Sequence, residues 1–217
     1  MTAGAWVWLG LAAGFAAGDW IAVGWGRRGL EYACKPAATL ALVAVAASLD
    51  PSHGDRRSWF VVALALSLIG DAFLMLPERP LRPDTWFIPG LGAFLLAQIA
   101  YTTGFAVHGP SAGEYAIGAA IVAVIGVPVA GRFVRALARS HQKAMIAPVL
   151  VYFGAIAAMV TSAIAGGNGW AIGGGALFMA SDSLIGETRF VGSRPWGPVA
   201  IIVTYHLAQA ALVVSLV

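Results

Sequence analysis

Three aspartates lie inside long apolar stretches of this 217-residue sequence, where ionisable side chains are rarely found. Asp71 is 13 positions past Ser58, and Asp182 is 13 positions past Gly169, the residues at which their apolar stretches begin. At about 1.5 Å of helix rise per residue, the two carboxyl groups are predicted to lie at similar depth. Asp19 falls slightly closer to the end of its own stretch. Because a charge within a bilayer costs at least a few kcal/mol, such residues usually face a polar cavity.

Two carboxyl groups at one depth could carry out acid–base chemistry. In a low-dielectric site, neighbouring carboxyls separate their affinities for protons, so one can donate a proton while the other stays ionised. Asp71 and Asp182 are therefore candidate catalytic residues. The competing interpretation is a pair of structural acids that holds helices together, and the matched depth favours a shared site. Lys35 begins an apolar stretch on the same side, where lysines also commonly extend to the headgroups, and Asp19 could be a cap or interface residue.

Four more polar residues support a shared cavity. Gln98 and Tyr101 are three positions apart in one apolar stretch, and Tyr205 and Gln209 are four apart in another. Residues at these spacings lie on one face of a helix, so each pair points in one direction. The alternative is that these side chains only hydrogen-bond neighbouring helices.

The elements that carry these residues are apolar enough to cross a membrane. The sequence is 59% hydrophobic and only 11% charged, which is too little charge for the surface of a soluble domain. A spanning helix needs about 20 apolar residues. Eight stretches qualify: 4–24, 35–49, 58–76, 86–107, 113–131, 144–165, 169–187 and 198–217. Because the connections are short, we predict one all-α membrane domain, residues 1–217, built as a bundle of eight transmembrane helices.

The basic residues alternate between the connections and predict an orientation. Eleven of the 13 Lys and Arg residues fall in the first, third, fifth and seventh connections. They are Arg27, Arg28, Lys35, Arg79, Arg82, Arg132, Arg135, Arg139, Lys143, Arg189 and Arg194. Cytoplasmic loops are enriched in Lys and Arg. The sequence therefore predicts a multi-pass protein of the cell membrane with both termini outside the cytoplasm.

Several function classes are not supported. The net charge of +3 is spread over loops and forms no basic stripe, so we expect no nucleic-acid partner. Cys34 is the only cysteine, which excludes an internal disulfide and a cysteine metal cluster. The four histidines are scattered and no phosphate-loop motif occurs, so neither a metal nor a cofactor is expected. The sequence does not indicate an oligomeric state.

An internal regularity relates the two halves of the chain. Asp71 and Gln98 are 27 positions apart, as are Asp182 and Gln209, and the two pairs are offset by 111 positions. One interpretation is that the first four helices and the last four are parallel repeats that meet at a pseudo-symmetric site. The other interpretation is coincidence, because few residues carry the pattern.

Five segments occur in order from the second apolar stretch to the eighth. They are KPAATLAL from Lys35, SLIGDAFLMLP from Ser67, GLGAFLLAQIAY from Gly90, ALFMASDSLIGETRF from Ala176 and YHLAQAALVVS from Tyr205. Together, their Lys-Pro, Gly-Asp and Ser-Asp pairs resemble the YhhN family, which includes the mammalian lysoplasmalogenases. One departure is Gln98, where many members are expected to have histidine. Glutamine cannot relay a proton as histidine does.

The resemblance implies a hydrolase that cleaves the vinyl ether bond of a lysoplasmalogen or a related lyso-lipid. The products are a fatty aldehyde and a glycerophospho-alcohol. Protonation of the β-carbon gives an oxocarbenium ion that water attacks, so the reaction needs a carboxylic acid and a carboxylate. Asp71 and Asp182 suit this pair, with the two roles unassigned.

The same resemblance implies roles for the remaining polar residues. Lys35 would meet the lipid phosphate at the level of the headgroups, and Asp19 would orient Lys35. The cavity would be lined by Gln98, Tyr101, Tyr205 and Gln209. The runner-up function belongs to another class: a transporter or binding protein for an amphiphile, coupled to protons through the two acids.

Overall fold

The computed structural model describes residues 1–49, 54–77, 84–107, 109–140 and 142–217, which form eight α-helices. The helices are α1 (Ala3–Gly24), α2 (Arg28–Ser48), α3 (Gly54–Met75), α4 (Phe87–Ala106), α5 (Ala112–Arg139), α6 (Ile146–Ala165), α7 (Gly169–Gly186) and α8 (Gly197–Val214). A short 3-10 helix, η1 (Lys143–Met145), precedes α6, and a π-helical segment, η2 (Glu187–Val191), follows α7. No strand occurs in these ranges. The predicted all-α fold is therefore confirmed.

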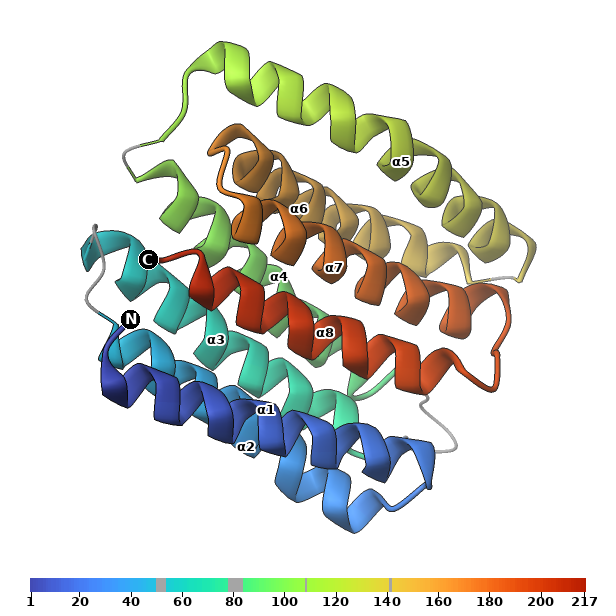
Figure 1. The fold of residues 1–217 in the computed structure, drawn as a ribbon. Coiled ribbons are helices and arrows are strands. Elements are labelled where there is room, and N and C mark those ends of the chain that lie inside the picture. Colours follow the sequence, from blue (N-terminus) through green and yellow to red (C-terminus); the bar gives the residue numbers. More distant parts are fainter. Residues whose placement is uncertain (50–53, 78–83, 108, 141) are drawn as a thin grey trace.

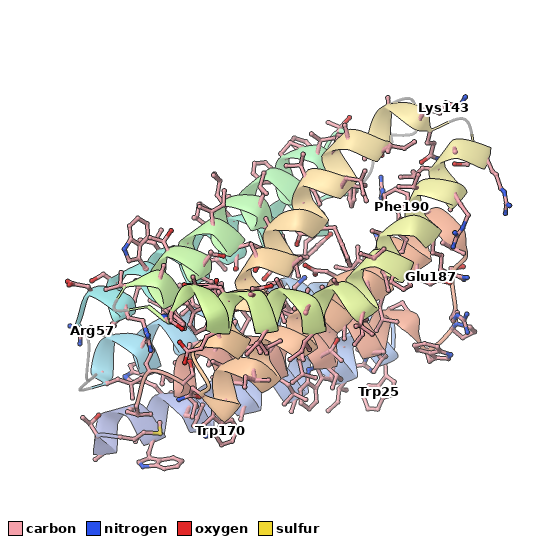
Figure 2. All side chains as sticks on the ribbon, turned by 90° about the horizontal axis from the view of Figure 1, so that it is seen from above. Trp25, Arg57, Lys143, Trp170, Glu187 and Phe190 are labelled. Carbon is pink, nitrogen blue, oxygen red and sulfur yellow. The ribbon has the colours of Figure 1, made fainter. Side chains whose placement is uncertain are left out.

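The eight helices run side by side along one direction, and both chain termini lie at the same end of the bundle (Figure 1). Figure 2 shows Arg57 and Trp170 at one end and Lys143 and Glu187 at the opposite end. Of the predicted loop residues, Lys143 lies at a bundle end (Figure 2), whereas Arg132, Arg135 and Arg139 lie inside α5 and Lys35 lies inside α2. The predicted loop residues Arg79 and Arg82 lie outside the described ranges.

Seven of the helices in the described ranges are long and apolar enough to cross a membrane. The exception is α7, which has the same length as α8 but is less apolar. Three consecutive glycines, Gly173 to Gly175, and the charged Asp182 dilute its apolar content. Nevertheless, α7 packs against both α6 and α8 (Figure 1). The structure supports a helical membrane protein, whereas eight membrane crossings stay a prediction.

The largest departures from the predicted boundaries are in α5 and α2. Helix α5 ends at Arg139, eight residues past its predicted end at Gly131. Helix α2 starts early. It begins at Arg28, seven residues before the predicted start at Lys35. The early turns contain Glu31 and Tyr32, which hydropathy alone excludes from an apolar stretch although both are compatible with a helix. As a result, Pro36 lies inside α2, and Lys35 projects from the body of the helix rather than from its end.

Two glycines allow the helices that carry the aspartates to pack closely on their neighbours. A Cβ atom at Gly70 of α3 would lie 2.5 Å from the Phe94 ring of α4. A Cβ atom at Gly174 of α7 would lie 2.9 Å from the Leu212 side chain of α8. The missing side chains of these glycines therefore allow close helix approach, with α3 against α4 and α7 against α8.

The helix neighbours show a partial correspondence between the two halves. Helix α2 packs on α3 and α8, and correspondingly α6 packs on α7 and α4. The correspondence is incomplete in the described ranges, because α1 packs on α8 whereas α5 has no comparable contact with α4. The repeat therefore stays a prediction that superposition of the two halves would test.

Candidate active site

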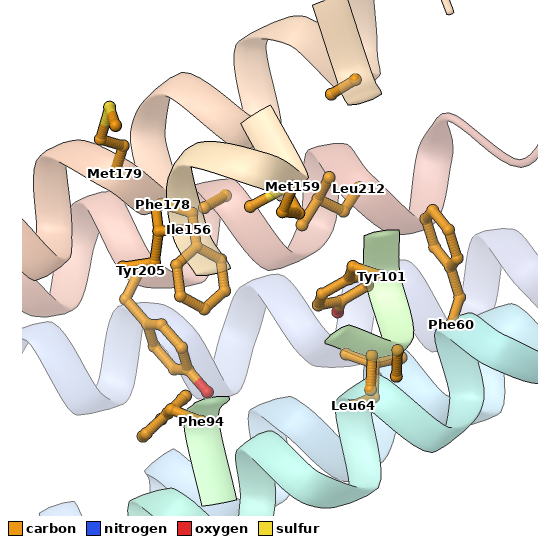
Figure 3. Close-up of a cluster of buried hydrophobic side chains, with 14 of the residues drawn as sticks. Phe60, Leu64, Phe94, Tyr101, Ile156, Met159, Phe178, Met179, Tyr205 and Leu212 are labelled. Atoms are coloured by element: carbon orange, nitrogen blue, oxygen red, sulfur yellow. The ribbon is translucent and has the colours of Figure 1, made fainter. Parts of the chain in front are cut away.

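Lys35, Asp71 and Tyr205 form a buried polar cluster between α2, α3 and α8. Lys35 Nζ lies 2.9 Å from Asp71 Oδ1, and the Tyr205 hydroxyl donates a hydrogen bond of 2.7 Å to Asp71 Oδ2. Asp71 is only 1% exposed. Tyr205 is held between the rings of Phe94 and Phe178, with centroid distances of 6.0 and 5.8 Å (Figure 3). Both oxygens of this carboxylate therefore have a donor.

Tyr101 and Gln209 extend this cluster away from Asp71. The Tyr101 hydroxyl donates a hydrogen bond of 2.5 Å to Gln209 Oε1, and Gln209 Nε2 donates one of 3.3 Å to the Tyr205 oxygen. Both side chains are fully buried. They contribute to neither of the two pockets described below. The structure thus places them behind Tyr205, whereas the sequence predicted that they line the cavity.

Asp182 has a different environment. It accepts a hydrogen bond from the Tyr152 hydroxyl of α6, and no ion pair with a cation is formed among the described side chains. Asp71 and Lys35 are near enough to interact electrostatically with Asp182. Tyr152 was not among the residues predicted from the sequence. It lies in an otherwise apolar stretch, and because a buried hydroxyl usually has a hydrogen-bond partner, this position was a signal for a polar contact.

Gln98 lies beside Tyr152, the hydrogen-bond donor of Asp182. Its side chain is fully buried beside Tyr152, yet neither amide atom has a partner in normal hydrogen-bond geometry within the described chain. Buried amides without partners are costly. Gln98 is therefore a polar group that is available to a bound molecule or water.

Asp182 and Tyr152 contribute to the wall of an apolar pocket. The pocket is formed by helices α3 to α7 and η2 and holds about 520 Å³ of space, including its open mouth. Its phenylalanine rings are those of Phe87, Phe94, Phe133, Phe153 and Phe190. A carboxyl group thus lies against a pocket that is otherwise built for an apolar molecule.

A wider polar vestibule adjoins this pocket. It holds about 1240 Å³ of space, including its opening. Its polar wall is made by Lys35, Asp84, Gln142, Thr188 and Arg189. The vestibule and the apolar pocket share the side chains of Leu74, Phe87 and Ile185. The two spaces are therefore neighbours, with cationic groups on one side and Asp182 on the other.

The π-helical segment η2 shapes the mouth of these spaces. Arg189 forms an ion pair of 2.6 Å with Asp84, and its guanidinium lies 3.8 Å from the centre of the Phe87 ring. Arg132 donates two hydrogen bonds, of 2.8 and 2.5 Å, to Glu187 and so ties η2 to α5. These bonds lower the pKa of Glu187 below its ordinary value. π-Helical turns of this kind frequently occur at functional sites.

Asp19 does not join the predicted site directly. It is fully buried, and neither of its oxygens has a hydrogen-bond partner in the described chain. Its nearest ionisable partner is His206, whose Nε2 lies 3.9 Å away and whose Nδ1 accepts a 3.1 Å hydrogen bond from Trp20. No hydrogen bond or ion pair joins Asp19 to Lys35 in the described ranges, so the expected orienting contact is absent.

Possible metal ligands do not cluster in the described part of the chain. Among the described residues, no group of three or more His, Cys, Asp or Glu side chains is arranged to hold a metal ion. Three of the four histidines, His53, His108 and His141, lie outside the described ranges.

Comparisons with known proteins place the chain in a family. The sequence pattern of the YhhN family matches residues 30–216, a segment that contains every predicted site residue except Asp19. Proteins named lysoplasmalogenase from Mycobacterium bovis and Mycobacterium tuberculosis are each 32% identical over 201 aligned residues, which cover 81% of this chain and 74% of the relative. Human lysoplasmalogenase TMEM86B is 28% identical over 155 residues, covering 70% of this chain and 61% of that protein. No solved structure matches the chain. By its match over most of its length, the chain belongs to the YhhN family.

Proposed function

We propose that this protein is a membrane hydrolase that cleaves the vinyl ether bond of a lysoplasmalogen or a closely related lyso-lipid. The products are a fatty aldehyde and a glycerophospho-alcohol. The names of its relatives support this activity. The observation that carries the proposal is the position of Asp182, a carboxyl group on the wall of an apolar pocket that adjoins a polar vestibule.

The two adjoining spaces fit the two ends of a lyso-lipid. The apolar pocket, with its five phenylalanine rings, suits a hydrocarbon chain. The vestibule presents Lys35 and Arg189, which suit the anionic phosphate of a headgroup. A lipid held in this way has its vinyl ether, which joins the chain to the glycerol, near the boundary between the two spaces. Asp182 lies on the wall of the apolar pocket, three residues before Ile185, which lines both spaces.

In this mechanism, Asp182 is the acid. Its protonated carboxyl gives a proton to the β-carbon of the vinyl ether, and the π electrons form the new C–H bond. Tyr152 then stabilises the resulting carboxylate through its hydrogen bond to Asp182. Water adds to the oxocarbenium carbon, and its proton returns to Asp182. The hemiacetal then breaks its C–O bond, which gives the aldehyde and the free glycerol hydroxyl.

Asp71 is the carboxylate of the pair. With donors on both oxygens, it stays ionised, and its charge stabilises the oxocarbenium ion that develops nearby. Each carboxylate oxygen can accept more than one hydrogen bond, so Asp71 keeps capacity to orient the attacking water. Because Lys35 neutralises this charge in the resting state, the site carries one compensated pair and one neutral acid.

The proposal includes the eight-crossing topology. Reporter fusions after Ala144 or Arg189 are expected to be cytoplasmic, and a fusion at the C-terminus is expected to be external. The alternation of basic residues between the connections supports this orientation. A cytoplasmic C-terminus would contradict it.

The decisive experiment measures aldehyde release by the purified protein in detergent. A vinyl ether lysophospholipid is compared with the lysophospholipid that carries an ester at the same position. We expect stoichiometric aldehyde from the vinyl ether and no product from the ester. Binding or vesicle transport of both lipids without aldehyde would instead favour the carrier interpretation.

A further inference from the structure

A buried chain of hydrogen bonds approaches Asp71 from α4 and α8. It begins at the Tyr101 hydroxyl, passes through the Gln209 amide and ends at the Tyr205 hydroxyl, which donates to Asp71 Oδ2. Tyr101 and Gln209 are fully buried, and Tyr205 is 4% exposed. The chain therefore acts on Asp71 without contact with solvent.

The chemistry of the three groups fixes the direction of this chain. An amide has an oxygen that only accepts and a nitrogen that donates, whereas a hydroxyl can do both. Because Tyr101 donates to the Gln209 oxygen, the amide nitrogen faces Tyr205 and donates to its oxygen. The Tyr205 proton is then directed to Asp71. Every donor in the chain points toward the carboxylate.

Protonation of Asp71 requires the whole chain to reverse. Oδ1 already faces the Lys35 ammonium, which can only donate, so an added proton goes to Oδ2. Asp71 would then donate to Tyr205, and Tyr205 would donate to the Gln209 oxygen after a rotation of the amide. The amide nitrogen would then donate to Tyr101, whose own proton would lose its acceptor.

Tyr101 resists this reversal. In the described part of the chain, Gln209 is the one hydrogen-bond partner of its hydroxyl, and the nearest ring, Phe60, lies edge-on at a centroid distance of 4.9 Å. A buried donor without an acceptor carries the full cost of its desolvation. We propose that Tyr101 and Gln209 are positioning residues that hold Asp71 in its carboxylate form by fixing the direction of the chain. The link to catalysis rests on the proposed function, whereas the effect on Asp71 does not.

The ionisable groups around Asp71 come from four helices. Lys35 on α2 and Tyr205 on α8 touch it, and Asp19 on α1 and Asp182 on α7 act at longer range. The variants used below leave all of these side chains in place. A change in the titration of Asp71 in those variants therefore reports the hydrogen-bond chain.

The test compares Tyr101→Phe, Gln209→Met and the double variant. The carboxylic C=O infrared band of Asp71, assigned by its loss in Asp71→Asn, is followed through a pH titration. In Tyr101→Phe, either orientation of the Gln209 amide leaves one amide atom without a partner, so neither orientation is preferred. Protonation of Asp71 then costs less, and the midpoint of its titration rises by about one pH unit. In Gln209→Met, protonation still leaves the Tyr205 proton without an acceptor, so the midpoint stays close to that of the wild type.

The double variant provides the sharpest outcome. The higher titration midpoint of Asp71 in Tyr101→Phe requires the Gln209 amide to rotate. Because the double variant lacks this amide, its midpoint is expected to equal that of Gln209→Met. A merely structural role of Tyr101 predicts the same shift in both backgrounds, and that result would overturn the proposal, as would an unshifted Tyr101→Phe. Tyr115→Phe on α5 is the matched control and leaves the midpoint unchanged.

Rates separate this inference from the proposed function. In an active enzyme, the acidic limb of the pH–rate profile should move with the infrared midpoint in Tyr101→Phe, at nearly unchanged KM. If the wild type releases no aldehyde, the proposed function fails while the infrared titration still decides the inference. If the wild type is active and neither readout shifts, the inference alone fails.

Discussion

Asp71 on α3 and Asp182 on α7 are the same residue type, and each lies 13 positions past the start of its predicted apolar stretch, yet their surroundings differ. Asp71 is almost fully buried, paired with Lys35 and hydrogen-bonded by Tyr205. Asp182 is half-buried, contributes to an apolar pocket and has Tyr152 as its donor. Among the described residues, a cation pairs with Asp71 and none pairs with Asp182.

The different surroundings favour different chemical roles for the two carboxyl groups. A carboxyl next to an ammonium favours the ionised form, whereas one against apolar side chains with a neutral donor is better suited to carry a proton. Enzymes that use two carboxyls commonly separate their roles through their environments. The asymmetry therefore supports the proposed roles, with Asp182 as the acid and Asp71 as the stabilising carboxylate.

The largest expected effect comes from breaking the Lys35–Asp71 pair. Asp71→Asn leaves the Lys35 charge without its counter-charge, and Lys35→Met leaves Asp71 in the same condition. Each single substitution should lower the free energy of unfolding by about 3 kcal/mol, and Asp71→Asn should also reduce turnover by at least about a hundredfold. Unfolding in mixed detergent micelles and aldehyde release measure the two effects.

The double variant, Asp71→Asn with Lys35→Met, tests the cause of this loss. It should recover most of the stability, because no uncompensated charge remains, but none of the turnover. Additive losses of stability in the double variant would show that the pair is not coupled.

Asp182→Asn is expected to separate function from stability. Since Asp182 has no cationic partner in the described chain, its replacement leaves no charge unpaired. We expect a loss of turnover of at least about a hundredfold and a free energy of unfolding within about 0.5 kcal/mol of the wild type. Asp55→Asn, at an exposed position in the first turn of α3, is the control. Near-normal turnover in Asp182→Asn would remove the acid from the mechanism.

Tyr152→Phe should have a smaller effect. The hydroxyl stabilises the Asp182 carboxylate that forms as the proton is transferred, and a hydrogen bond to a charged group contributes about 1.5 kcal/mol or more. Turnover should therefore fall about tenfold while KM changes little. A selective increase in KM would instead make Tyr152 a substrate-binding residue.

The smallest effect on stability is expected from the Arg132–Glu187 ion pair, which joins α5 to η2. The pKa of Glu187 is lowered by the hydrogen bonds from Arg132, so its stabilising contribution is present above the unfolded-state pKa and is lost as pH falls through the folded-state pKa. Because Arg132 is half-exposed, Glu187→Gln should lower Tm by at most about 2 °C at neutral pH. The difference from the wild type should vanish in acid. A pH-independent difference would contradict this account.

Local sequence patterns were sufficient to predict the helices but not the side-chain contacts between different helices. Apolar stretches located all eight helices. The matched positions singled out Asp71 and Asp182, whose catalytic roles stay a prediction. The pairing of Lys35 with Asp71, the Tyr152 donor and the Asp19–His206 contact were all missed. Each depends on the rotation of one helix against another, which the hydropathy of a single stretch does not contain. The start of α2 was missed because its first turns are polar.

The low apolar content of α7 has a consequence for the biogenesis of the protein. A segment with three glycines and an aspartate gains little from the bilayer by itself. Its close packing at Gly174 against Leu212 supplies contacts that exist only after α8 has been synthesised. By that time α6, which carries Tyr152, has already left the ribosome. We therefore expect Asp182 to meet its hydrogen-bond donor already in place, so that the site assembles after α8 has been synthesised.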